Sequence, residues 1–205
     1  MASLSLHPQE IHRWFSDNGD NTHILNYDLN EDSKVMDLGG FVGVWAEKII
    51  NKYNPHVYLI EPIPQFYDQM VSKFHNNNKV HLMRTAVGNE NKNGFIYLNG
   101  DGSSSNLSNE SGIPVEYKTI EKILNDFNLD SVDLLQINIE GDEYPLLENM
   151  LTTGSAHKFK NIQVQFHMGI EDDVKRREWI HEQFIKNNFK LKYNYSFVWE
   201  AWTKI

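Results

Sequence analysis

A glycine-rich turn between a buried strand and a helix constrains this chain more than any other feature. Residues 35–36 have the pattern of the end of a buried strand, and apolar residues from Val44 onward recur at helical spacing. Between them lies the segment DLGGFVG, residues 37–43. Glycine is used where a backbone turns sharply or passes close to a ligand, so the junction predicts an α/β fold with a ligand at the turn.

A carboxylate follows the next apolar run. Residues 56–60 are expected to form a second strand, and this strand ends at Glu61. At the ligand edge of a parallel sheet, a carboxylate can accept hydrogen bonds from the 2′ and 3′ hydroxyls of a ribose. The glycines alone are also explained by the tight turn itself, but together with Glu61 they predict a site for a nucleoside-bearing cofactor.

The spacing of the glycines discriminates between nucleoside cofactors. Dinucleotide sites use G-x-G-x-x-G, whose second glycine makes room for a pyrophosphate, and Phe41 occupies that place here. The pattern D-x-G-x-x-x-G instead suits S-adenosyl-L-methionine, because Asp37 can face its ammonium group directly or through water. On the third strand, Arg84 and Ala86 are expected to border the adenine, although Arg84 can equally be a solvated charge. The predicted cofactor-binding residues are Asp37, Gly39, Gly40, Phe41, Gly43, Glu61, Arg84 and Ala86.

Length and composition agree with one enzyme-sized domain spanning residues 1–205, which begins with a helical segment over residues 1–30. The formal charge of −9 disfavours nucleic acid and anionic membranes as partners. The chain has no cysteine, which excludes disulfides and thiolate metal sites. We expect a cytoplasmic protein, because no apolar run approaches the roughly 20 residues of a membrane span and the N-terminus lacks a secretory pattern.

Predicted strands and helices alternate along the chain, which indicates a doubly wound sheet. The expected helices are residues 8–17, 43–53, 64–77, 119–128, 144–151 and 172–187. Thr119 is expected to cap the helix over residues 119–128. The helix over residues 172–187 is expected to have an apolar stripe formed by Trp179, Ile180, Phe184 and Ile185. The expected strands after residue 60 are residues 80–87, 132–139, 162–166, 189–195 and 197–205. The last two strands form a hairpin, hence an antiparallel edge.

Residues 89–117 are expected to be an insertion over the ligand edge of the sheet. They contain short β-like runs at residues 95–98 and 115–117, with Gly102 to Asn106 between them.

Several blocks in order resemble the FkbM family of S-adenosylmethionine-dependent methyltransferases, over roughly residues 27–197. The blocks are YDL at 27–29, VMDLGGFVG at 35–43 (family D-x-G-A-N-x-G), IEPIP at 60–64 (F-E-P-x-P), AVG at 86–88 (A-x-G) and VDLLQINIEGDE at 132–143 (D-L-L-K-I-D-x-E-G-x-E). The resemblance implies the Rossmann-like class I methyltransferase fold: a mostly parallel seven-stranded sheet with a C-terminal antiparallel hairpin and helices on both faces. It also implies O-methylation, here of a hydroxyl on a sugar, a glycan or another small metabolite.

The chain departs from the family pattern at the ligand edge. Gly40 and Phe41 replace Ala-Asn, Gln136 replaces a lysine, and Asn138 replaces an aspartate. Gln165 stands where the family's E-x-H ending has its acid. Asn138 cannot act as a base, so a proton acceptor must lie elsewhere. These departures leave open a catalytically weak cofactor-binding module, and methylation of RNA or protein is a further alternative that a basic channel would favour.

The predicted catalytic residues lie at the carboxyl ends of neighbouring strands. We expect Asn138 to orient the methionine portion or the acceptor, Glu140 to position the acceptor hydroxyl, and His167 to accept its proton. With an ordinary pKa of about 6.5, a histidine is neutral and basic at cytoplasmic pH. The alternatives are a hydrogen-bonded structural histidine and, for Glu140 and Glu143, satisfaction of helix N-terminal donors. We predict no obligatory metal, because too few carboxylates converge at this edge.

Overall fold

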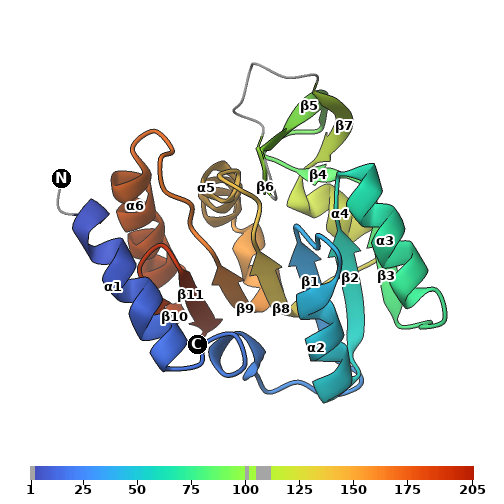
Figure 1. Ribbon diagram of the computed structural model, residues 1–205, viewed down its shortest axis with the longest axis horizontal. Coiled ribbons are helices and arrows are strands. Elements are labelled where there is room, and N and C mark those ends of the chain that lie inside the picture. The colour runs from blue at the N-terminus through green and yellow to red at the C-terminus, as the bar shows by residue number, and fades with distance from the viewer. Residues whose placement is uncertain (1–2, 100–101, 105–111) are drawn as a thin grey trace.

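The computed structural model describes residues 3–99, 102–104 and 112–205. Its main sheet has seven strands in the order β10-β11-β9-β8-β1-β2-β3 (Figure 1). The strands are β1 (Lys34–Leu38), β2 (His56–Ile60), β3 (Val80–Met83), β8 (Val132–Ile137), β9 (Phe159–Val164), β10 (Phe189–Tyr195) and β11 (Trp199–Lys204). Strand β11 runs antiparallel to both β9 and β10, and the other pairs are parallel. The predicted sheet and its C-terminal hairpin are therefore confirmed.

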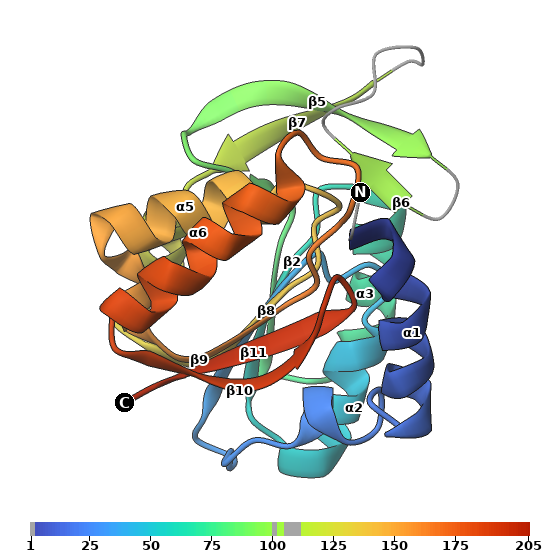
Figure 2. The ribbon, with the colours of Figure 1, turned by 90° about the vertical axis from the view of Figure 1, so that its left-hand side faces the viewer.

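Helices cover both faces of this sheet, because alternate residues of the buried strands point to opposite sides. Met36 and Leu38 of β1 join a core with α4, α5 and α6, whereas Val35 joins a core with α1, α2 and α3 (Figure 2). The helices are α1 (Ser3–Ser16), α2 (Val44–Tyr53), α3 (Pro64–Phe74), α4 (Ile120–Asp126), α5 (Glu143–Thr153) and α6 (Asp173–Lys186), with short 3₁₀ turns η1 (His23–Leu25) and η2 (Ser155–Lys158). The predicted cap holds: the Thr119 hydroxyl accepts the N–H of Lys122.

The third strand is shorter than predicted. Residues 80–87 were expected to form one strand, but β3 ends at Met83 and the chain then leaves the main sheet. Ala86 and Val87 form β4 (Ala86–Val87), which pairs with β7 (Ile113–Lys118) of a second sheet. The hydroxyl of Thr85 donates to the carbonyl of Glu116 at 2.7 Å and fixes this change of direction.

The second sheet lies over the ligand edge of the main sheet (Figures 1 and 2), and its strands other than β4 come from the segment that includes residues 89–117. Its strand order is β4-β7-β5-β6, with β5 (Lys92–Asn99) and β6 (Gly102–Ser104). Of the expected serine-rich loop, Ser105 and Asn106 lie outside the described residues. Ile96 of β5 contributes to the cavity below, so the insertion forms part of the site.

The stripe predicted for the last helix is half correct. Ile180 and Phe184 of α6 are fully buried, but Trp179 is 39% exposed and Ile185 is 65% exposed. The remaining inward position on this face is Arg177, which pairs with the buried carboxylate of Glu200 at 2.5 Å. The buried face of this helix includes a charged residue, so the pattern of apolar residues alone did not identify it.

Candidate cofactor and active site

The predicted glycine turn closes tightly over the neighbouring strand. The backbone N–H groups of Gly39 and Gly40 both donate to the carbonyl of Ile60, at 3.0 and 3.1 Å. Gly39 has φ +83°, and a Cβ on it would lie 2.0 Å from the backbone oxygen of Asn138. The turn therefore needs glycine at position 39 both for its backbone angle and for space.

Glu61 lies against this turn. Its carboxylate accepts the N–H of Phe41 at 2.9 Å and the N–H of Ile63 at 2.9 Å, and the residue is 4% exposed. Burial raises the pKa of Glu61 to about 7, while these two backbone donors lower it. Each carboxylate oxygen has a second lone pair, so Glu61 can still accept hydroxyl groups from a ligand.

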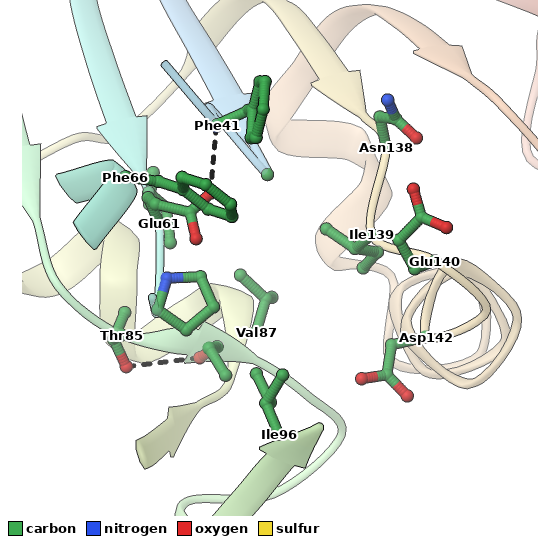
Figure 3. Close-up of a pocket in the computed structure, with 14 residues that line it drawn as sticks. Phe41, Glu61, Phe66, Thr85, Val87, Ile96, Asn138, Ile139, Glu140 and Asp142 are labelled. Atoms are coloured by element: carbon green, nitrogen blue, oxygen red, sulfur yellow. Dashed lines mark hydrogen bonds between the residues drawn. The ribbon is translucent and has the colours of Figure 1, made fainter. Parts of the chain in front are cut away.

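A cavity of about 180 Å³ opens beside Glu61 (Figure 3). One wall is aromatic, because the rings of Phe41 and Phe66 pack edge to face with centroids 4.4 Å apart. Asn138 and Glu140 lie on the opposite side. The lining residues are Gly39, Phe41, Ile60, Glu61, Pro62, Phe66, Thr85, Ala86, Val87, Ile96, Asn138, Ile139, Glu140 and Asp142.

A second cavity, of about 350 Å³, shares Gly39, Phe41 and Asn138 with the first. Its other lining residues are Asp20, Ile24, Asp37, Gly40, Val44, Trp45, Lys48, Gln136 and Trp199. The glycine turn is thus bordered by two adjoining cavities, one containing Glu61 and the other containing Asp37.

The predicted cofactor residues differ in how they meet these cavities. Ala86 lines the first cavity, but its neighbour Arg84 is exposed and lines neither, and Thr85 contributes instead. The solvated alternative for Arg84 is therefore the one that agrees with the structure. Gly43 also lines neither cavity; with φ +74° it begins helix α2.

Asp37 is buried at the floor of the second cavity. Burial raises its pKa to about 7; a hydrogen bond from Gln136 lowers it, and the charge of Glu61 raises it further. The amide of Gln136 donates to Asp37 Oδ1 at 3.1 Å, and its carbonyl accepts from Gln163. Gln163 in turn accepts the hydroxyl of Tyr27 at 2.7 Å. Gln136, the departure from the family's lysine, thus belongs to a buried network that fixes Asp37.

Asn138 carries an unpaired polar atom between the two cavities. Its Oδ1 is buried and has no hydrogen-bond partner among the residues that the structure describes. A buried amide oxygen without a partner costs about 1–3 kcal/mol, so this atom is ready to accept a donor from a ligand.

The predicted catalytic residues Glu140 and His167 form a cluster with Glu143. Nε2 of His167 lies 3.4 Å from Glu140 Oε2, and Nδ1 lies 3.1 Å from Glu143 Oε1. Burial lowers the pKa of His167, but the hydrogen bonds and charges of Glu140 and Glu143 outweigh burial and raise it to about 10. The prediction of a neutral His167 is therefore wrong: at neutral pH this ring is an imidazolium.

Glu143 has a larger role than the sequence indicated. It is fully buried, and its carboxylate accepts the backbone N–H of Gly141 at 2.7 Å and that of His167 at 2.7 Å. The first bond agrees with the expected satisfaction of donors near a helix start. The bond from the His167 N–H places the buried carboxylate of Glu143 against His167. This contact depends on the pairing of β8 with β9, so the local sequence could not show it.

Neither a metal centre nor a membrane span emerges from the described part of the chain. Over residues 3–99, 102–104 and 112–205, no group of three or more His, Asp and Glu side chains is arranged to hold a metal ion. Over the same ranges, no helix has both the length and the apolarity needed to cross a bilayer.

Comparison with known proteins decides the family. The sequence model of the methyltransferase FkbM domain matches residues 37–196. This chain belongs to the FkbM methyltransferase family. It is accordingly an S-adenosylmethionine-dependent methyltransferase. No curated protein matches its sequence.

Solved structures share the fold of this FkbM methyltransferase at low sequence identity. Fibrillarin pre-rRNA processing protein of Methanococcus jannaschii is 12% identical with a TM-score of 0.54, covering 87% of this chain and 69% of its own. Ribosomal protein L11 methylase of Lactobacillus delbrueckii subsp. bulgaricus is 12% identical with a TM-score of 0.51, covering 92% and 79%. Aeropyrum pernix fibrillarin, solved with natively bound S-adenosyl-L-methionine, is 8% identical with a TM-score of 0.51, covering 92% and 74%. The class I Rossmann-like methyltransferase fold is thereby confirmed.

The residues that line the two adjoining cavities fit S-adenosylmethionine. Gly39 leaves room where a Cβ would collide with the backbone, and Asn138 offers an unpaired oxygen at the join of the two cavities. Glu61 has lone pairs that can accept the hydroxyls of a ribose, and the carboxyl group of Asp37, when ionised, can face an ammonium group. An elongated ligand with a nucleoside at one end and an amino acid at the other matches this order of groups.

Proposed function

We propose that this FkbM methyltransferase transfers the methyl group of S-adenosylmethionine to a hydroxyl oxygen of a sugar, a glycan or another small metabolite. The observation that carries the proposal is the Glu140–His167–Glu143 cluster at the border of the first cavity. It offers a carboxylate, held by a charged ring, to a ligand that needs a proton acceptor. Transfer to oxygen requires such an acceptor, because the hydroxyl proton must leave as the new bond forms.

Each residue of the cluster has its own part in this proposal. Glu140 lines the cavity and accepts the hydroxyl proton of the acceptor. His167 is a positioning residue, since its imidazolium holds Glu140 at 3.4 Å, and Glu143 in turn holds His167. Bound S-adenosylmethionine supplies an activated methyl group on a sulfonium, so no metal is needed to activate the donor.

Asn138 and the cavity walls orient the reactants. The free Oδ1 of Asn138 accepts a donor from the acceptor or from the methionine portion of the cofactor. The aromatic wall of Phe41 and Phe66 and the insertion residue Ile96 limit the access of water. Holding two reactants in line in a restricted space is a large part of catalysis in a reaction of this kind.

The charge of the cavity supports a neutral, hydroxyl-rich acceptor. Its ionisable lining groups are the carboxyl groups of Glu61, Glu140 and Asp142, and neither lysine nor arginine lines it among the described residues. Carboxylates bind sugar hydroxyls well as hydrogen-bond acceptors but repel phosphates. With a formal charge of −9 for the whole chain, RNA is the less favoured acceptor.

A methyl-transfer screen tests the proposal. The protein is incubated with labelled S-adenosylmethionine and separate panels of glycans and small polyols, RNA, and protein, and transferred label is counted. Transfer to a glycan or polyol, lost in Glu140→Gln, is the expected result. Transfer to RNA or protein instead would overturn the acceptor class. Cofactor binding with no transfer to any panel would favour a binding module that has lost the chemistry through Gln136, Asn138 and Gln165.

A further inference from the structure

The second cavity contains a cation to which no role has been given so far. It is lined by Asp37 at its floor and by Lys48 from helix α2. Lys48 is the one cation that lines either cavity, considering the part of the chain that the structure describes. A lysine and an aspartate in one cavity match a ligand that carries both charges.

Lys48 has only weak partners of its own. Its Nζ donates to the backbone carbonyl of Asp20 at 3.3 Å and to Oδ1 of Asn21 at 3.3 Å, both long bonds to neutral oxygens. No carboxylate of the described residues lies within ion-pair distance of it. By contrast Lys73, on the neighbouring helix, is paired with Glu47 at 3.2 Å. The charge of Lys48 is thus available to a ligand.

The cavity also contains a second acid, Asp20, which has a structural hydrogen bond. Asp20 accepts the indole N–H of Trp14 at 2.9 Å, so it serves to join helix α1 to the cavity wall. Asp37 receives one side-chain donor, the amide of Gln136, and a carboxylate can accept several more. Both acids therefore keep acceptor capacity, and Asp37 is the one at the start of the glycine turn, whose Gly39 lines both cavities.

We propose that Lys48 binds the carboxylate of the cofactor's amino-acid end while Asp37 binds its ammonium group. The first cavity takes the nucleoside beside Glu61, and the second adjoins it through Gly39 and Asn138, so the amino-acid end is directed toward Lys48. Lys48 then selects for an intact carboxylate. The inference rests on cofactor binding alone and is independent of the acceptor.

Calorimetry with a pair of ligands tests this selection. Decarboxylated S-adenosylmethionine keeps the nucleoside and the ammonium group but lacks the carboxylate. We expect wild type to bind S-adenosylmethionine more tightly than this analogue by about 10- to 100-fold, the usual value of a charged hydrogen bond. Lys48→Gln should lose most of that preference, by weakening the binding of S-adenosylmethionine and leaving the analogue nearly unchanged.

Lys52 provides the matched control, since it lies one turn further along α2, lines neither cavity, and donates to the carbonyl of Leu25. Lys52→Gln makes the same charge change and should keep the wild-type preference. Lys48→Arg, which retains a cation, should also keep it and serves if Lys48→Gln fails to fold. The inference is overturned if Lys48→Gln retains the preference or weakens both ligands equally. Wild type that binds neither ligand would instead overturn the cofactor assignment.

Discussion

The carboxylate of Glu61 accepts the backbone N–H of Phe41 at 2.9 Å. This bond joins the end of β2 to the glycine turn after β1. Phe41 has φ +50°, a left-handed backbone that is costly for a residue with a bulky side chain. The bond to Glu61 helps to hold that conformation, and it places the Phe41 ring on the cavity wall. This side of the cavity, where we expect the nucleoside, is therefore held in shape by the protein's own hydrogen bond.

Replacing Glu61 should weaken cofactor binding. Glu61→Gln removes the charge that a ribose diol would contact, and a charged hydrogen bond is worth about 1.5–3 kcal/mol. Calorimetry with S-adenosylhomocysteine should show a loss of roughly 10- to 100-fold in affinity. Glu47→Gln, an exposed acid on α2, is the control. Unchanged affinity in Glu61→Gln would refute the assignment of this residue.

The raised pKa values of Asp37 and Glu61 lead us to expect that rising pH lowers the stability of the ligand-free protein but raises its affinity for the cofactor. Burial holds the pKa values of Asp37 and Glu61 at about 7, above their unfolded values. The ligand-free folded state therefore binds more protons, and its stability falls as pH rises through the interval up to about 7, with a limiting slope of about 1.4 kcal/mol per pH unit for each group. Asp37→Asn should flatten this fall in denaturant titrations between pH 5 and 7.

Cofactor affinity should change in the other direction. An ammonium group binds the ionised form of Asp37, so the affinity for S-adenosylhomocysteine should rise between pH 5.5 and 8. The comparison is made by calorimetry on wild type and Asp37→Asn. Affinity that is independent of pH in wild type would contradict the contact between Asp37 and the ammonium group.

Alanine substitutions at two glycines with the same backbone angle should distinguish the cost of backbone strain from the cost of a steric collision. Gly39 and Gly154 both have φ +83°, but a Cβ on Gly154 would meet nothing within 4 Å. Gly154→Ala should cost about 1–2 kcal/mol, the price of a left-handed alanine. Gly39→Ala adds the collision with Asn138 and should lower the free energy of unfolding by clearly more, and abolish cofactor binding. Equal losses in urea titrations would show that the turn relaxes.

The sequence predicted the features that depend on neighbouring residues and regular patterns. The turn at residues 37–43 and Glu61 each end a buried strand, and adjacent parallel strands bring their carboxyl ends together. The break after Met83 could not be predicted, because the apolar pattern continues and the pairing of Ala86 with Tyr117 decides it.

Groups that act through distant partners were also missed. Glu143 follows an expected helix start, and nothing in its local sequence shows that His167 lies against it. The charge of His167 was misjudged for the same reason, since its pKa depends on two carboxylates from another strand end. Lys48 lies on helix α2 among other charged residues, and its sequence position does not distinguish it from them. Only the structure shows that it lines a cavity.

The cluster around His167 predicts how turnover depends on pH. With a pKa raised to about 10, the His167 ring stays protonated and holds Glu140 throughout the neutral range, so kcat should be flat from about pH 7 to 9 and fall near pH 10. Glu143→Gln removes one of the anions that raise this pKa, and the fall should move to lower pH. Glu148→Gln, an acid of the same helix paired with Arg176, is the control and should leave the profile unchanged. Titration of the His167 ring by NMR gives the same test without turnover. An ordinary pKa near 6.5, with kcat rising through it, would return the role of base to His167.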